Sequence, residues 1–152
     1  GLSVSGQAEA GATVTIRDSS NTVLGSAVAN GNGQFIVPLN AAQTNGQALI
    51  ATATDIANNE SAAATVVAPD STAPEMPKNV VISEDGASIS GTAEPGSAIT
   101  ITTPDGTPLG SGKADGEGHF TLPLAPAQTN GEQVTVTATD SANNVSPPTT
   151  AQ

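Results

Sequence analysis

The sequence predicts an all-β protein made of two tandem sandwich domains, and three observations support this fold class. β-branched residues alternate with their neighbours in short runs, for example over 13–16, 99–102 and 134–137. This period of two is typical of strands. Glycine, proline, asparagine and aspartate separate the runs, as they do in turns. The sequence also repeats itself, which indicates two copies of one domain.

The repeat has an offset of 85 positions, at which Ser5 falls on Ser90. The segment 43–46 then falls on 128–131, and 53–59 falls on 138–144 with a single difference. Positions 5 to 61 align without a gap, and about half of them are identical. A period this long indicates a tandem array of whole domains, because solenoid repeats are only ~20–50 residues long.

We place the two domains at 1–69 and 70–152, with a proline-rich linker at 68–77. Gly1 aligns with Gly86, so the first repeat has no counterpart of the segment 78–85. We therefore expect the first domain to lack its first strand. Because the chain begins with glycine rather than methionine, we expect it to be a segment of a longer protein. The linker prolines fix φ and predict a short, semi-rigid spacer.

The complete second repeat contains seven short runs separated by turn residues, and we predict a strand for each. The runs cover 79–83, 87–92, 98–103, 109–114, 119–124, 133–139 and 145–150. Seven strands at this spacing predict an immunoglobulin-like sandwich. Phe35 and Phe120 share one repeat position and are the only bulky core candidates. Smaller apolar residues should pack around them, namely Leu24/Leu109, Ile16/Ile101, Leu39/Leu124 and Leu49/Val134.

Composition and charge exclude several classes of function. Only 36% of the residues are hydrophobic and 1% are aromatic, so each core must be thin. A net charge of −11 excludes a surface that follows nucleic-acid phosphates and a polybasic membrane anchor. No run approaches the ~18 apolar residues of a membrane span. The chain has no cysteine, which excludes disulfides, thiolate zinc sites and thiol nucleophiles.

The sequence does not predict an enzyme or a small-molecule substrate. His119 is the only histidine, and Gln34 takes its place in the first repeat, so we interpret it as a surface residue at the start of a strand. A hydrolase needs a base, a nucleophile and an oxyanion cradle held together. Two carboxylates could cleave glycosides, but sugar sites present aromatic and apolar walls, and this chain has neither Trp nor Tyr.

Acidic and amide side chains gather in the loops that follow the second, fourth and sixth predicted strands. Strands alternate in direction, so these loops should lie at the end of the domain where it begins, close to the linker. The residues concerned are Glu94, Asp115, Glu117, Asp140, Asn143 and Asn144, with Asp70 and Glu75 from the linker. Ca²⁺ takes ~6–8 hard oxygen ligands in a flexible cage. The presence of any single acid in these loops is explained by the exposure of loops to solvent. Asp70 and Asp140 together favour a calcium site.

The chain resembles the tandem bacterial Ig-like repeats of large type I-secreted, biofilm-associated adhesins of the RTX type. The resemblance rests on the segments 70–74, 90–96 and 138–146, and on 53–61 in the first repeat, and it covers essentially the whole chain. In that family such repeats are extenders between a cell-anchored end and a distal adhesive tip, and calcium at the junctions stiffens the rod. The resemblance therefore implies an extracellular location on the bacterial surface.

The resemblance also implies particular ligands. The family's linker aspartate corresponds to Asp70, and the aspartate that ends its sixth strand corresponds to Asp55 and Asp140. Where the family commonly has Gly-Asn, this chain has Asn-Asn, so Asn58 and Asn143 must accept the turn geometry alone, which asparagine can do. The predicted Ca²⁺ ligands are Asp70, Asp140, Glu94, Asn143, Asn144 and Asp55.

We thus predict a monomeric, non-enzymatic extender whose partners are neighbouring repeats of the same chain, and which supports adhesion and biofilm formation. Two alternatives stay open. The first is an Ig-like module that binds a protein or a glycan, whose sign would be an exposed aromatic or apolar patch. The second is a passive spacer in a secreted enzyme.

Overall fold

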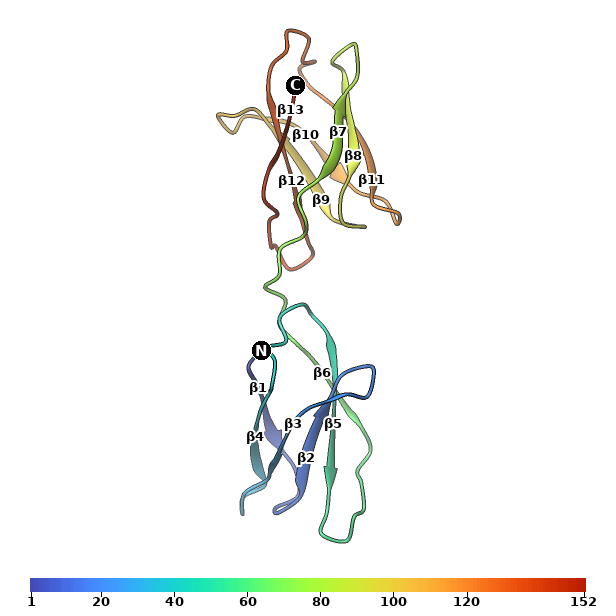
Figure 1. The fold of residues 1–152 in the computed structure, drawn as a ribbon. Helices are drawn as coiled ribbons and strands as arrows, with labels where there is room; N and C mark the ends of the chain where they lie inside the picture. The colour runs from blue at the N-terminus through green and yellow to red at the C-terminus, as the bar shows by residue number, and fades with distance from the viewer. The chain divides into compact units, whose positions relative to one another are not determined.

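The computed structural model describes the whole chain, Gly1–Gln152, and contains thirteen strands and no helix (Figure 1). The chain divides into two compact units, Gly1–Ser71 and Thr72–Gln152, and each is described here by itself. The prediction of an all-β fold with two tandem domains is confirmed. The structure has no helix that is long and apolar enough to cross a membrane.

The second unit is a complete sandwich of two antiparallel sheets, with strand orders β11-β8-β7 and β10-β9-β12-β13. Its strands are β7 (Lys78–Ile82), β8 (Ser88–Thr92), β9 (Ala98–Thr102), β10 (Pro108–Lys113), β11 (His119–Pro123), β12 (Val134–Thr139) and β13 (Thr149–Ala151). The seven predicted strands are all present, because alternating β-branched residues suit a sheet with one buried face.

The last strand begins later than the sequence predicted. The run 145–150 was expected to be extended throughout, but β13 covers Thr149–Ala151, and Val145 forms only an isolated bridge with Thr139. Pro147 and Pro148 lie between these two pairings. Proline has no N–H to donate, so the ladder cannot run through the pair.

The first unit has six strands in two sheets, with orders β1-β4 and β3-β2-β5-β6. They are β1 (Ser3–Gln7), β2 (Thr13–Arg17), β3 (Val23–Val28), β4 (Gln34–Pro38), β5 (Ala48–Thr54) and β6 (Ala64–Val67). The repeat offset matches β1 with β8, and so on to β6 with β13. Only β7 has no counterpart, which confirms that the first domain lacks its first strand.

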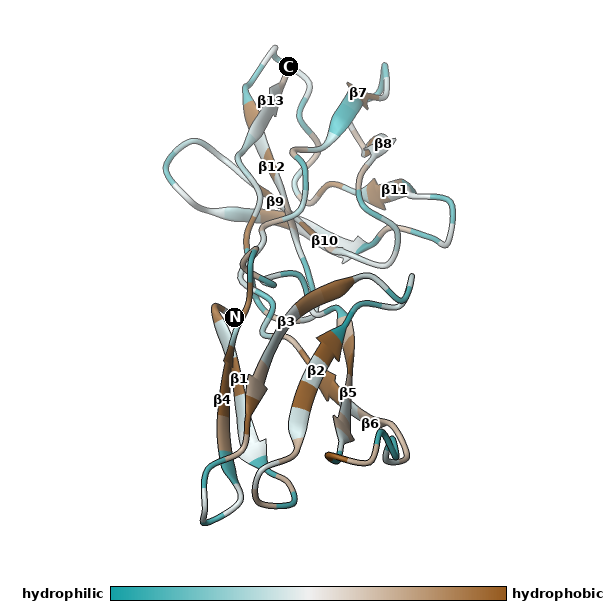
Figure 2. Ribbon diagram, turned by 60° about the horizontal axis from the view of Figure 1, so that its bottom comes forward, coloured by the Kyte–Doolittle hydropathy of each residue, from teal (hydrophilic) through white to brown (hydrophobic).

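Each unit has its own core between its two sheets, and Figure 2 shows the hydrophobic residues on β2 and β4 of the first unit. Ile16 and its repeat equivalent Ile101 are both fully buried, as predicted. Phe120 is 4% exposed, but Phe35 is only partly buried, so Phe35 is not the enclosed core residue that was expected. The difference arises because the second unit has a third strand in the sheet above the ring and the first unit does not.

Candidate functional site

The strand register brings the predicted acidic loops to one end of the second unit. Thr139 at the end of β12 and Lys113 at the end of β10 both pair with Ala98 at the start of β9. Thr92 at the end of β8 pairs with Lys78 at the start of β7. The loops after β8, β10 and β12 therefore share the end at which the unit begins.

Asp140 organises the turn that follows β12. Its Oδ1 accepts the backbone N–H groups of Ala142 at 2.8 Å and Asn144 at 2.9 Å. Its Oδ2 accepts the side-chain amide of Asn144 at 2.8 Å. This side-chain hydrogen bond is the main reason that the pKa of the Asp140 carboxyl lies below its ordinary value. The carboxylate is consequently ionised throughout the neutral range, and both its oxygens already accept hydrogen bonds.

Asp55 closes the same turn in the first unit. Its Oδ1 accepts the backbone N–H of Asn59 and its Oδ2 accepts the Asn59 side-chain amide, both at 2.9 Å. The Asn59 side chain likewise lowers the pKa of the Asp55 carboxyl. The residues between, Asn58 and Asn143, have φ values of 63° and 68°. The prediction that these asparagines accept the left-handed turn geometry is confirmed.

Asp70 lies outside the turn that Asp55 closes. It belongs to the first unit, where it forms an isolated bridge with Asn45 in the loop between β4 and β5. The backbone N–H of Ser71 donates to the Thr44 carbonyl at 2.7 Å and holds the segment there. This loop precedes β5, whereas the Asp55 turn follows β5, so Asp70 and Asp55 lie at opposite ends of the first unit.

Glu94 lies in the turn between β8 and β9, and its side chain is exposed. Its backbone carbonyl, rather than its carboxylate, holds the turn, because it accepts the Ser97 hydroxyl at 2.7 Å. The backbone N–H of Gly96 donates to the Asp115 carbonyl at 3.3 Å and ties this turn to the loop after β10. Glu94 therefore shares an end of the unit with Asp140 without a direct hydrogen bond to it.

The structure thus places Asp140, Asn143 and Asn144 in one turn of the second unit and Asp55 in the equivalent turn of the first unit, and within the first unit it leaves Asp70 at the other end from Asp55. No group of three or more His, Cys, Asp or Glu side chains is close enough to hold a metal ion. The carboxylate and amide oxygens fit the chemistry of Ca²⁺. The sequence analysis did not foresee that Asp55 and Asp140 bind their own turns, although the shared Asp-x-Ala-Asn-Asn pattern is a signal for an Asx-turn.

His119 stands at the start of β11 on the surface, where the sequence placed it. Its Nδ1 lies 3.9 Å from Asp115 Oδ1 and 3.9 Å from Glu117 Oε2, and all three side chains are exposed. Asp115 Oδ1 accepts the backbone N–H groups of Glu117 and His119, both at 2.9 Å, and the His119 N–H is the main cause of the lowered pKa of Asp115. The arrangement is a hairpin turn closed by an aspartate.

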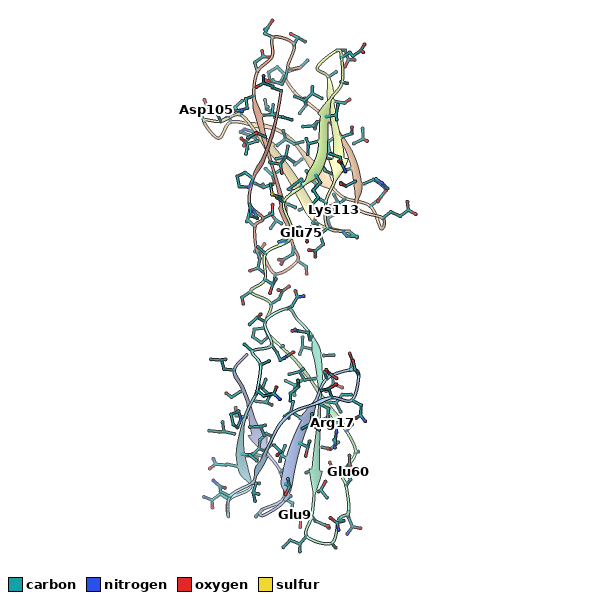
Figure 3. The ribbon with its side chains drawn as sticks, in the orientation of Figure 1. Glu9, Arg17, Glu60, Glu75, Asp105 and Lys113 are labelled. Atoms are coloured by element: carbon teal, nitrogen blue, oxygen red, sulfur yellow. The ribbon has the colours of Figure 1, made fainter.

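Other charged side chains form few contacts. Figure 3 shows Arg17 and Glu60 on the same side of the first unit, where Arg17 Nη1 lies 4.0 Å from Glu60 Oε1. Lys78 forms an exposed ion pair with Glu75 in the second unit. Exposed pairs of this kind contribute little to stability, because water and salt screen them.

Comparison with known families defines the class of protein. The model of the bacterial Ig domain family matches residues 1–70 and again 73–152. The chain therefore belongs to the bacterial Ig domain family and consists of two tandem members. Ig-like domains are typically structural modules without catalytic activity.

Solved structures with a related arrangement include a biofilm-associated protein described as its BSP domain, with 19% identity and a TM-score of 0.42. That alignment covers 99% of this chain and 27% of the other, so the chain spans about a quarter of its length. A two-domain fibronectin type III segment of chicken tenascin has 16% identity and a TM-score of 0.41, covering 99% of this chain and 90% of the other. No curated protein sequence matches the chain.

Proposed function

We propose that this chain is an extender segment of a bacterial surface adhesin, and that it acts outside the cell to support adhesion and biofilm formation. The observation that supports this most directly is the tandem repeat of one bacterial Ig domain, in which aspartate side chains form hydrogen bonds within their own turns. Asp55, Asp115 and Asp140 each accept hydrogen bonds from their own turn. A unit built this way serves to continue the chain from one repeat to the next.

An adhesion assay tests this role. The chain, immobilised on a bead or displayed on a cell, should retain neither host glycans nor polysaccharide matrix above the level of a blank surface. An extender carries force between other parts of a protein, so it needs no ligand of its own. Specific, saturable retention of a glycan or of a soluble protein would show an adhesive module and would overturn the extender assignment.

We further propose that Ca²⁺ stiffens the junction between neighbouring repeats through Asp70 and Asp140, with Glu94, Asn143 and Asn144 supplying further oxygens. Asp55 is the equivalent ligand of the first unit. The position of the Asp140 turn supports this proposal, because it lies at the end of the second unit at which the chain enters. The net charge of −11 also supports it, since a bound cation relieves the repulsion between acids.

Calorimetric titration of metal-free protein with Ca²⁺ tests these ligands. Asp70→Asn and Asp140→Asn should each weaken binding. Asp105→Asn is the matched control, because Asp105 also accepts hydrogen bonds within a turn but lies at the other end of its sheet, in the loop between β9 and β10. The calcium assignment is wrong if both test variants bind like the unmodified chain.

Small-angle scattering with Ca²⁺ and then with chelator tests the stiffening itself. We expect a larger maximum dimension with Ca²⁺ while the far-ultraviolet circular dichroism stays constant. An unchanged dimension would show that calcium is not the stiffening agent. A collapse of the spectrum in chelator would instead make calcium a folding cofactor, because metal binding would then be coupled to folding.

A further inference from the structure

The hairpin formed by β3 and β4 in the first unit carries no charged side chain. The segment 19–54, which contains both strands and the loop between them, has no Asp, Glu, Lys, Arg or His. The equivalent segment 104–139 of the second unit contains six such residues, namely Asp105, Lys113, Asp115, Glu117, His119 and Glu132. The chain as a whole has a net charge of −11. The hairpin is therefore an uncharged region of a strongly acidic protein.

Two large aliphatic side chains are exposed on this hairpin. Val28 of β3 is 63% exposed and Ile36 of β4 is 68% exposed, and Figure 2 shows hydrophobic stretches on both strands. The backbone N–H of Asn30 donates to the Gln34 carbonyl at 2.8 Å and closes the hairpin. These four residues line one hollow of about 610 Å³, whose lining has no charged residue. We call the four residues together the neutral patch.

The exposure of Val28 and Ile36 belongs to the hairpin itself. β3 pairs with β2 as β10 pairs with β9, and β4 pairs with β1 as β11 pairs with β8. The repeat equivalents of the two residues are Lys113 and Thr121, and both are exposed in the second unit, whose sandwich is complete. These are surface positions in either unit. The two units differ there in chemistry, because the first presents aliphatic groups where the second presents an ammonium group and a hydroxyl.

Charge decides which partner the neutral patch fits. A cationic partner would be attracted to the acids elsewhere on the chain, and an anionic partner would meet net repulsion with no cation on the hairpin to pair with. Two copies of this chain repel each other through their acids, but the hairpins bring no like charges together. A second copy also supplies matching groups, since an amide side chain carries both a donor and an acceptor. The patch is thus complementary to itself.

We infer that the neutral patch is a self-association surface, on which a second copy of this chain docks through the same patch in a twofold arrangement. Val28 and Ile36 of the two copies cover one another, and the Asn30 and Gln34 amides lie at the rim. Two aliphatic side chains per copy make a weak, reversible dimer, whereas the sequence predicted a monomer. The contact forms independently of calcium. It leaves the extender role intact, because it sets copies side by side and binds no foreign ligand.

Sedimentation velocity of the full chain in chelator, over a range of protein concentrations, tests this contact. The weight-average sedimentation coefficient should rise with concentration towards that of a dimer, and more so at high salt, because salt screens the repulsion between acidic copies. The double variant Val28→Lys with Ile36→Thr carries the residues of the second unit at both positions. It should weaken association by at least about tenfold, because it removes the aliphatic contact. The added lysine lowers the net negative charge, so greater overall repulsion cannot cause this loss.

The matched control is Ile56→Ser, which replaces a 95% exposed side chain in the turn after β5 with its repeat equivalent and should associate like the unmodified chain.

Amide hydrogen exchange of the unmodified chain adds a test that needs no variant, because high protein concentration should slow exchange in β3 and β4. A monomer at every concentration and salt, or a double variant that associates as strongly as the unmodified chain, would overturn the inference. Association that requires Ca²⁺ would also overturn it, since the contact would then run through acidic side chains.

Discussion

Phe35 and Phe120 show that the burial of a side chain depends on the strands around it. The two side chains occupy the same repeat position, and each lies under a glycine of the neighbouring strand. Phe120 is enclosed between two complete sheets, whereas Phe35 lines a groove of about 600 Å³ between β1 and the β5–β6 pair of the first unit. Because apolar burial stabilises in proportion to the area removed from water, the same residue contributes less in the first unit.

Replacing each phenylalanine with alanine measures this difference. Phe120→Ala should lower the free energy of unfolding of its unit by about 3–5 kcal/mol, the usual loss for a buried phenylalanine. Phe35→Ala should cost less than about 3 kcal/mol, since part of its ring is already in contact with water. Urea denaturation followed by circular dichroism gives both values. Equal losses would contradict the structure, because they would require an equally covered ring in the first unit.

At the scale of elements, hydrogen-bonded turns fix the positions of the short strands that follow them. The Asp140 carboxylate receives three hydrogen bonds from the turn between β12 and β13, and the Asp55 carboxylate has the same role between β5 and β6. Asparagine with positive φ completes both turns. The strands that follow, β13 and β6, have three and four residues, so the turns rather than long ladders position them.

These turns predict a sensitivity to acid. The folded-state pKa of Asp140 lies below the ordinary value of 3.8, so its stabilisation is complete above that value and is lost as the pH falls through the folded pKa. Urea midpoints should therefore be level from pH 7 to about pH 5 and fall below about pH 4. Asp140→Asn should reduce this acid dependence, and Glu84→Gln, an exposed acid in another turn, should leave it unchanged. If the urea midpoint of Asp140→Asn fell with pH as steeply as that of the unmodified chain, the loss of stability in acid would come from other carboxylates.

At the scale of the whole molecule, two units with separate cores predict two unfolding steps. The second unit has an additional strand and a larger buried cluster, which includes Phe120, Val136 and Ala138. Its greater apolar burial should make it the more stable unit. Separate cores also favour independent unfolding of the units.

Scanning calorimetry of the metal-free chain should accordingly show a lower transition for the first unit and a higher one for the second. Phe35→Ala should move only the lower transition and Phe120→Ala only the upper, because each ring belongs to the core of its own unit. Added Ca²⁺ should raise the upper transition more than the lower if the proposed ligands are correct. A single transition that both substitutions shift equally would show that the units unfold as one.

The fold could be predicted largely from the sequence, because its signals are local or repeated. Alternation predicted the strands of the second unit, and the offset of 85 predicted a first domain without its first strand. Only the last strand was misplaced, since a proline pair interrupts it. The candidate site could be predicted less well from the sequence. The shared end of the acidic loops followed from strand alternation, but the hydrogen bonds that occupy Asp55 and Asp140 were not foreseen, because loop acids suggest ligands and turn closure equally.

The sequence by itself determined the two tandem bacterial Ig domains, the short β-branched strands and the turn conformation of Asn58 and Asn143. These features depend on backbone preferences and spacing within a few residues, or on the comparison of one repeat with the other. Only the tertiary structure decided that Phe35 is left partly uncovered and that Asp70 pairs with Asn45 in the first unit. Burial and hydrogen-bond partners depend on residues distant in the chain, which no local pattern can specify.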